Sequence, residues 1–141
     1  MTINELFGVS GKVAIVTGGS RGIGEMITSG FFANGVKVYI TARKEGPLIE
    51  KAEELSKKYN GDCIPIACDL SSTVGTNYFV EKILKHEKGI DFLINNAGAA
   101  WGEPYKSFSE SGWDKVMDLN VKSLFFLTQK LTELLKANAT K

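Results

Sequence analysis

The fold-determining stretch of this chain is KVAIVTGGSRGIG, residues 12–24. Its apolar first part is typical of a buried strand, and Ile23 and Met26 then begin a helical pattern. Gly18, Gly22 and Gly24 therefore lie on a turn that leads from a strand into a helix. Free N–H groups and the helix dipole favour an anion there, and glycine lets a phosphate approach the backbone. The spacing is G-x-x-x-G-x-G, which differs from the usual G-x-G-x-x-G.

The composition is that of one globular domain. The 141 residues are 43% hydrophobic and 23% charged, which excludes a disordered chain. A net charge of +1 gives no indication of nucleic acid or of an anionic membrane surface. No long apolar run and no basic, apolar leader is present, so we expect a cytoplasmic protein, although an organelle is not excluded. Cys63 and Cys68 should point to opposite faces of one strand and stay reduced.

Strand and helix patterns alternate along the whole chain. Strands are predicted at 12–17, 36–41, 63–68 and 90–95, with Pro65 placing the third at an edge. Helices are predicted at 22–34, 47–59 and from Ser71 or Ser72 to 88, and a long one follows Ser111. Such alternation predicts an α/β fold with a doubly wound parallel sheet in the order 3-2-1-4. Residues 1–141 would then form one dinucleotide-binding domain, with the glycine turn close to residues 95–98.

Four short motifs in this order resemble the short-chain dehydrogenase/reductase family. They are TGGSRGIG at residues 17–24, Asp69-Leu70 after the third strand, NNAG at 95–98 and LNV at 119–121. The resemblance implies a Rossmann fold and hydride transfer between a nicotinamide cofactor and a small-molecule carbonyl or alcohol. It is strongest to the 3-oxoacyl-thioester reductases, including the rhamnolipid-type branch. It covers only the N-terminal part of a usual member, whose later strands are missing here.

The end of the second strand bears on the choice of cofactor. In dinucleotide sites an acidic residue about twenty positions after the glycines binds the ribose 2′-OH, whereas arginine accommodates a 2′-phosphate. The family resemblance aligns Ala42 with that acid, and Arg43 follows it. Arg43 and Arg21 would then flank the adenosine ribose, which favours NADP(H). Alternatively, Arg43 and Lys44 are solvated charges after a strand.

The resemblance implies a set of cofactor-binding residues. Asp69 and Leu70 would lie beside the adenine ring, although Asp69 could instead cap the next helix. Asn95 and Asn96 would tie the fourth strand to its neighbours. The full implied set is Gly18, Gly19, Ser20, Arg21, Gly22, Ile23, Gly24, Arg43, Asp69, Leu70, Asn96, Ala97 and Gly98.

Asn120 is the candidate catalytic residue. It falls on a stripe of apolar positions that includes Trp113, Val121 and Leu124, where an amide needs a hydrogen-bond partner. It could be a core asparagine that bonds its own helix. The resemblance implies instead a place in the family's proton relay with a serine, a tyrosine and a lysine.

The remaining members of that relay are not present. After Asn120 there is one serine, Ser123, and no tyrosine. The Y-x-x-x-K match at Tyr78 and Lys82 lies on the wrong helix and is interpreted as a chance match. His86 is interpreted as solvated, and no residues have metal-ligand spacing.

Two readings of the whole chain stay open. The first is a truncated reductase, inactive by itself, whose intact form is a homodimer or homotetramer. The second is a short protein that binds a nucleotide or a partner without catalysis. The leucine-rich end (Leu131, Leu134 and Leu135) should lack its cover in a truncated chain, which favours the first reading.

Overall fold

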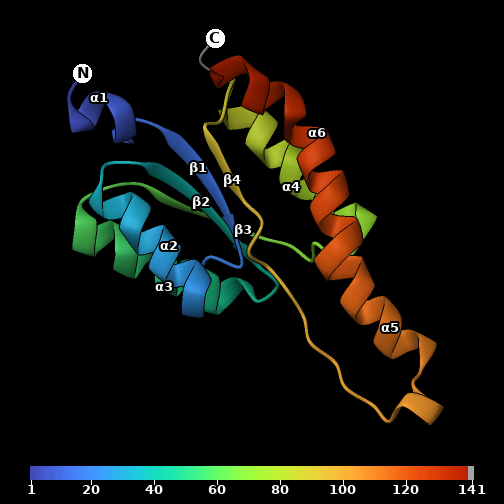
Figure 1. Ribbon diagram of the computed structural model, residues 1–141. Helices are drawn as coiled ribbons and strands as arrows, with labels where there is room; N and C mark the ends of the chain where they lie inside the picture. Colours follow the sequence, from blue (N-terminus) through green and yellow to red (C-terminus); the bar gives the residue numbers. More distant parts are fainter. Residues whose placement is uncertain (140–141) are drawn as a thin grey trace.

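A four-stranded parallel sheet in the order β3-β2-β1-β4 forms the centre of the computed structural model, which describes residues 1–139 (Figure 1). This confirms the predicted Rossmann-like order. The strands are β1 (Val13–Thr17), β2 (Lys37–Ala42), β3 (Cys63–Ala67) and β4 (Phe92–Ile94). The helices are α1 (Ile3–Phe7), α2 (Gly22–Ala33), α3 (Glu45–Tyr59), α4 (Thr73–His86), α5 (Glu110–Met117) and α6 (Ser123–Asn138), with short turns η1 (Tyr105–Ser107) and η2 (Asp118–Lys122).

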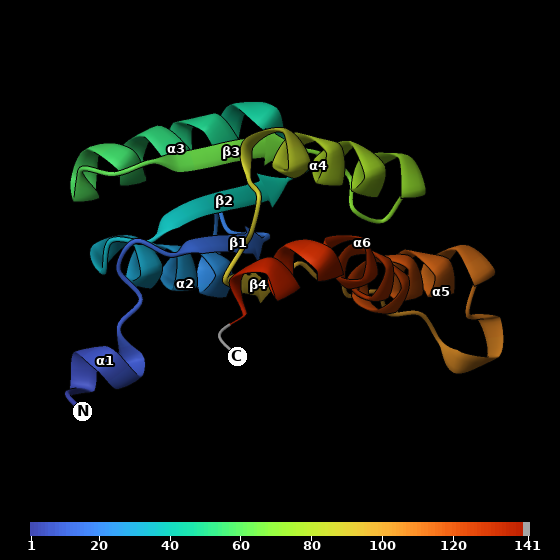
Figure 2. The ribbon, with the colours of Figure 1, turned by 90° about the horizontal axis from the view of Figure 1, so that it is seen from above.

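Helices cover both faces of the sheet. α2 and α3 lie on one face, and α4 and α6 lie on the other (Figure 2). Because β1 is buried on both faces, its side chains alternate between two cores: Ala14 and Val16 join the α2–α3 side, and Ile15 joins the α4–α6 side. This explains why the strand reads as a continuous apolar run.

The outer strand β3 pairs only with β2, and Pro65 lies opposite Ile40 in that pairing. Proline cannot donate to a further strand, so it suits this edge as predicted. Cys63 packs in the α2–α3 core and Cys68 packs against the α4–α6 core. The two thiols are free and lie on opposite faces, also as predicted.

The predicted single helix after residue 111 is wrong. Its cap is Ser109, whose hydroxyl accepts from the N–H of Gly112 at 3.0 Å. The helix is then interrupted by η2, a π-helical turn in which the N–H of Ser123 bonds the carbonyl of Asp118. A π turn rotates less per residue than an α turn, so the apolar stripe does not continue through it. Val121, within the turn, is 52% exposed instead of inward, and Trp113, which precedes the turn on α5, is 60% exposed.

The leucine-rich end of α6 is covered, whereas the sequence analysis expected it to lack a cover. Leu131 is fully buried, Leu134 is 7% exposed, and Leu135 packs against the same core. They are covered because α6 lies along α4, and the N–H of Ile90 bonds the carbonyl of Leu134 at 3.1 Å. The exposed apolar side chains lie elsewhere on this helix, at Leu124, Phe125 and Phe126.

One short segment, α1, stands apart from the layers. α1 was not predicted; it is closed by a capping box between Thr2 and Glu5 and buries none of its residues. No helix within residues 1–139 has the length and apolar character needed to cross a membrane.

Candidate functional site

The glycine turn joins the end of β1 to the start of α2. Gly18 and Gly22 have φ angles of +65° and +56°, a region that side chains with a Cβ rarely adopt. A Cβ at Gly22 would meet no atom within 4 Å, so only its backbone conformation requires glycine. Gly24 is different, because its Cβ would lie 2.1 Å from the carbonyl oxygen of Gly18. Glycine there permits close packing of helix and turn.

The turn presents unused donors. The N–H groups of residues 19–24 donate no hydrogen bond to any acceptor in the described part of the chain, and the first bonded donor is Glu25 to Arg21. Arg21 occupies the N-cap with an extended backbone, and its side chain makes no capping bond. These donors and the positive end of the α2 dipole make the turn fit a phosphate, as the sequence predicts.

The end of β4 is tied to the end of β1. The Thr17 hydroxyl accepts from the N–H groups of Asn96 and Ala97 at 3.0 and 2.9 Å, and donates to the carbonyl of Ile94 at 3.2 Å. The Asn96 amide donates to the carbonyls of Thr17 at 2.9 Å and Gly18 at 3.3 Å. The glycine turn and the NNAG motif therefore meet as expected, and buried Thr17 is a joining residue that sequence reasoning missed.

The neighbouring asparagine, Asn95, joins β4 to a different element. The amide of Asn95 donates to the Thr128 hydroxyl on α6 at 3.1 Å, which fixes β4 to that helix. Asn95 thus ties the fourth strand to a neighbour, in agreement with the sequence analysis.

Asn120 lies in η2 and is exposed. Its side chain accepts from the N–H of Ala99 and donates to the carbonyl of Ala99, both at 2.8 Å. The amide thus bonds neither a core group nor its own helix. The expectations that Asn120 lies on a buried apolar stripe and that it is a core asparagine bonded to its own helix are therefore both wrong. A Cβ at Gly98 would lie 3.3 Å from the Asn120 oxygen, so the loop passes close to it. A π turn inside a helix, like η2 between α5 and α6, is frequent at functional sites.

The two arginines lie at adjacent ends of elements. Arg21 precedes α2, and Arg43 follows β2. The turn and β2 are joined directly, because the N–H of Gly18 donates to the carbonyl of Thr41 at 2.8 Å. Both arginine side chains are exposed and make no ion pair with a carboxylate within residues 1–139. They are therefore available to an anionic group.

Asp69 begins the loop after β3. Its carboxylate accepts from the N–H and hydroxyl of Ser71 at 3.0 and 2.7 Å, so it closes a turn. The cap of α4 is Ser72, which accepts from the N–H of Gly75 at 3.0 Å. The alternative that Asp69 caps this helix is therefore wrong. Leu70 is 5% exposed, its side chain belongs to the α4–α6 core, and its carbonyl accepts from the Thr76 hydroxyl at 3.2 Å.

A further loop, residues 98–109, is organised by Glu103, which the sequence did not indicate. Its carboxylate accepts from the N–H of Ser109 at 2.6 Å, the indole of Trp101 at 2.8 Å and the Ser109 hydroxyl at 3.0 Å. These bonds hold the pKa of Glu103 below its usual value. Lys115 lies 3.8 Å from the Trp101 ring centroid, so the loop is fixed against α5.

The residues that the sequence analysis set aside are on the surface. Tyr78 is 45% exposed on α4, with the Lys82 ammonium 5.2 Å from its ring centroid, and His86 is exposed at the end of that helix. Among the described residues, no three or more His, Cys, Asp or Glu side chains could hold one metal ion.

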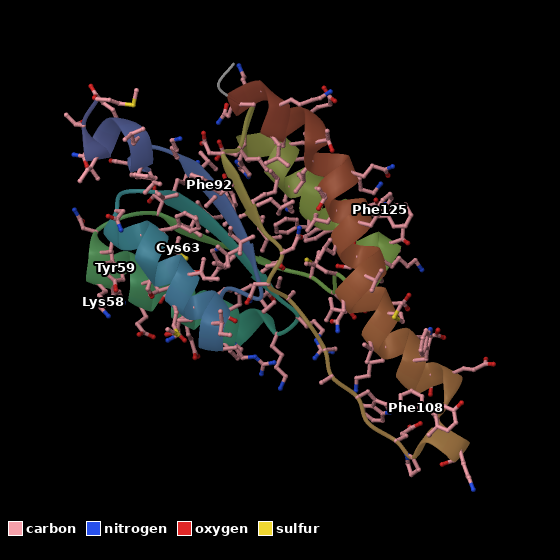
Figure 3. All side chains as sticks on the ribbon, viewed as in Figure 1. Lys58, Tyr59, Cys63, Phe92, Phe108 and Phe125 are labelled. Atoms are coloured by element: carbon pink, nitrogen blue, oxygen red, sulfur yellow. The ribbon has the colours of Figure 1, made fainter. Side chains whose placement is uncertain are left out.

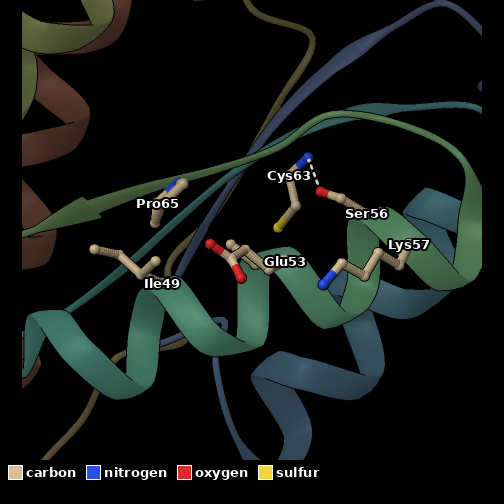
Figure 4. A pocket seen from close by; sticks show the side chains of 7 residues that line it. Ile49, Glu53, Ser56, Lys57, Cys63 and Pro65 are labelled. Carbon is tan, nitrogen blue, oxygen red and sulfur yellow. Dashed lines mark hydrogen bonds between the residues drawn. The ribbon is translucent and has the colours of Figure 1, made fainter.

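A shallow pocket of about 360 Å³ lies at the free edge of β3 (Figure 4). Helix α3 and strand β3 form it, and the N–H of Cys63 donates to the Ser56 hydroxyl there at 3.2 Å. Burial raises the pKa of the Cys63 thiol to about 12, so it is protonated at neutral pH and is not a nucleophile. The lining residues are Ile49, Ala52, Glu53, Ser56, Lys57, Cys63 and Pro65.

Fold and turn together define a nucleotide-binding α/β protein of the Rossmann type. The family model for short chain dehydrogenases matches residues 12–140, and the chain belongs to this family of oxidoreductases. This confirms the resemblance drawn from the four motifs.

Individual relatives are similar over most of the chain. The rhamnolipid-biosynthesis 3-oxoacyl-[acyl-carrier-protein] reductase of Pseudomonas aeruginosa is 42% identical over 134 residues, which are 95% of this chain and 52% of that protein. The Pseudomonas aeruginosa RhlG/NADP active-site complex superposes with a TM-score of 0.88 at 43% identity, covering 95% and 52%. L-Sorbose reductase from Gluconobacter frateurii, complexed with NADPH and L-sorbose, has a TM-score of 0.88 at 32% identity, covering 92% and 49%. The chain thus spans about half the length of these relatives.

Proposed function

We propose that residues 1–141 form the NADP(H)-binding part of a reductase that transfers a hydride between the nicotinamide and a carbonyl or alcohol. The observation that carries this proposal is the turn of free N–H groups at residues 19–24, with Arg21 and Arg43 beside it. No carboxylate follows β2 where a 2′-OH would be bound, since Ala42 and Arg43 stand there. The relatives' NADP and NADPH complexes support the same cofactor.

The roles of the binding residues follow from their chemistry. The free N–H groups of the turn would bind the pyrophosphate, and the two guanidinium groups would bind the 2′-phosphate. Asp69 would accept from the adenine amine. Ala97 and Gly98 leave the backbone open to the cofactor, and Asn96 holds them next to the turn. When bound, the cofactor supplies or accepts the hydride.

The substrate class that we propose is a 3-oxoacyl thioester, which is supported by the 42% identity to the Pseudomonas aeruginosa reductase. Asn120 would contribute to the catalytic set by holding the loop at Ala99. These residues contain no tyrosine after Asn120, so we propose that they bind the cofactor without turnover. Measurable NADPH oxidation with a 3-oxoacyl thioester by this chain would contradict that proposal.

The assembly and location are part of the same proposal. The exposed Leu124, Phe125 and Phe126 on α6 support a homodimer or homotetramer of the intact enzyme. The two free thiols, Cys63 and Cys68, support a cytoplasmic location.

The cofactor assignment is tested by calorimetric titration of the 141-residue chain with NADPH and NADH. We expect Arg43→Ala to weaken NADPH binding by about tenfold or more and NADH binding by less than about twofold. Lys57→Ala, at the far end of α3, is the matched control and should change neither affinity. Equal losses of both cofactors in Arg43→Ala would refute the phosphate assignment.

A further inference from the structure

Thr28 lies in the second turn of α2 and is completely buried. Its hydroxyl lies 2.8 Å from the carbonyl oxygen of Gly24 and 3.2 Å from that of Gly19. The first contact is the ordinary bond of a threonine to the preceding helical turn. The contact with Gly19 instead joins the helix to the glycine turn that precedes it, and a threonine that only stabilised its own helix would not need this contact.

The Gly19 carbonyl has no other donor. Gly19 is a buried residue, and within residues 1–139 the only donor to its carbonyl is the Thr28 hydroxyl, whose single proton is shared with the closer Gly24 carbonyl. A Cβ on Gly19 would lie 2.9 Å from the Thr28 oxygen and 2.6 Å from Cγ2 of Ile40. The turn is therefore in close contact with Thr28, and no other donor to this carbonyl is present among the described residues.

The contact between Thr28 and the Gly19 carbonyl determines where the N–H of Ser20 points. In a trans peptide the C=O and the following N–H point in opposite directions, so an inward Gly19 carbonyl directs the N–H of Ser20 outward. The Asn96 amide does the same for the preceding peptide, because its bond to the Gly18 carbonyl directs the N–H of Gly19 outward. Two successive amides held in this way form a concave anion site.

We propose that Thr28 is a positioning residue for the phosphate-binding turn, acting through the Gly19–Ser20 peptide. The inference rests on the proposed NADP(H) site and adds a residue that does not touch the cofactor. Without the hydroxyl, the Gly19 carbonyl would turn toward water, and the N–H of Ser20 would turn away from the pyrophosphate.

The test compares Thr28→Val, which keeps the shape and removes the hydroxyl, with Thr28→Ser, which keeps the hydroxyl. Each variant of the 141-residue chain is titrated with NADPH and with adenosine 2′-monophosphate, which lacks the pyrophosphate. Thr28→Val should weaken NADPH binding by about tenfold and 2′-monophosphate binding by less than about twofold. Thr28→Ser should retain NADPH affinity within about threefold.

Thr132→Val is the matched control, because within the described part of the chain the Thr132 hydroxyl bonds only its own helix, at the carbonyl of Thr128. It should leave both affinities unchanged. If Thr28→Val does not fold, Thr28→Ala against Thr28→Ser makes the same comparison. Unchanged NADPH binding in the hydroxyl-free variant, or an equal loss of both ligands, would overturn the role of Thr28. Failure of the unsubstituted chain to bind either ligand would instead overturn the cofactor site itself.

Discussion

The side chain of Asn120 and the backbone of Ala99, 21 residues apart in the chain, form a pair of hydrogen bonds of 2.8 Å each. One amide thus satisfies both the donor and the acceptor of a single loop residue. The pair joins the π turn η2 to the segment that follows β4, so it connects the candidate catalytic residue to the NNAG motif.

Asn120→Ala removes both bonds at once. Because the pair is exposed, water partly replaces them, and the free energy of unfolding should fall by about 1 kcal/mol in urea denaturation. The N–H of Ala99 should also exchange with solvent faster. Lys122→Ala, which removes an exposed ion pair of 3.4 Å with Asp118, is the control and should cost less than about 0.5 kcal/mol. Unchanged exchange at Ala99 in the alanine variant would contradict the pairing.

Two glycines of α2 should respond to alanine in opposite directions. At Gly24 a Cβ would lie 2.1 Å from the Gly18 carbonyl oxygen and 2.5 Å from the Asn96 amide nitrogen, so the turn must move. We expect Gly24→Ala to lower the free energy of unfolding by about 2 kcal/mol and to weaken NADPH binding. At Gly30 a Cβ would meet nothing within 4 Å, and Gly30→Ala should stabilise the chain by about 0.5–1 kcal/mol. Thermal melting of both variants measures this, and an unchanged melting temperature in Gly24→Ala would disprove the packing role of Gly24.

Tyr39 should make the protein sensitive to alkali. Burial and a hydrogen bond of 2.5 Å from its hydroxyl to Glu87 raise the pKa of Tyr39 to about 12 from its usual 10.0. The pKa of Lys37, which pairs with the same carboxylate, is also raised, first by that bond.

The sign follows from the raised values. The folded chain favours the protonated tyrosine, so its contribution is complete below pH 10 and is lost as the pH rises through about 12. Between these limits the free energy of unfolding should fall by about 2 kcal/mol on account of Tyr39. In Tyr39→Phe the free energy of unfolding should fall less over the same pH range. Urea midpoints measured across that range give the pH dependence of stability for both the unsubstituted chain and the variant. Identical slopes would show that Tyr39 does not titrate in this way.

The outer side of α6 should promote self-association. Phe125 lies on the side of the helix away from the sheet (Figure 3), 59% exposed, and its ring meets that of Phe126 at 5.2 Å between centroids. Phe125→Glu should lower the sedimentation coefficient of a concentrated sample, because a charge replaces exposed apolar area. Gln129→Glu adds the same charge at an exposed polar position of this helix and should leave it unchanged. A monomer at all concentrations would count against an interface on α6.

Much of the fold follows from local patterns. The apolar run at residues 12–17, the glycine turn and the alternation of helices with strands predicted the sheet order that the structure shows. Pro65 was correctly placed at an edge, because a missing N–H is a property of the residue itself. The contact between the glycine turn and the NNAG motif also followed, since the ends of neighbouring parallel strands must meet.

The sequence by itself therefore determined the family, the strand order and the place of the glycine turn, all of which depend on short-range spacing and residue type. Only the tertiary structure decided the partner of Asn120, the π turn that breaks the last helix, and the bonds of Thr17 and Thr28. The physical reason is that periodicity reports which face of an element is buried, whereas a hydrogen bond between distant segments depends on how rigid elements pack. Thr28 illustrates this: its sequence neighbours indicate a helix, and only the packing of α2 against the turn places its hydroxyl 3.2 Å from the Gly19 carbonyl.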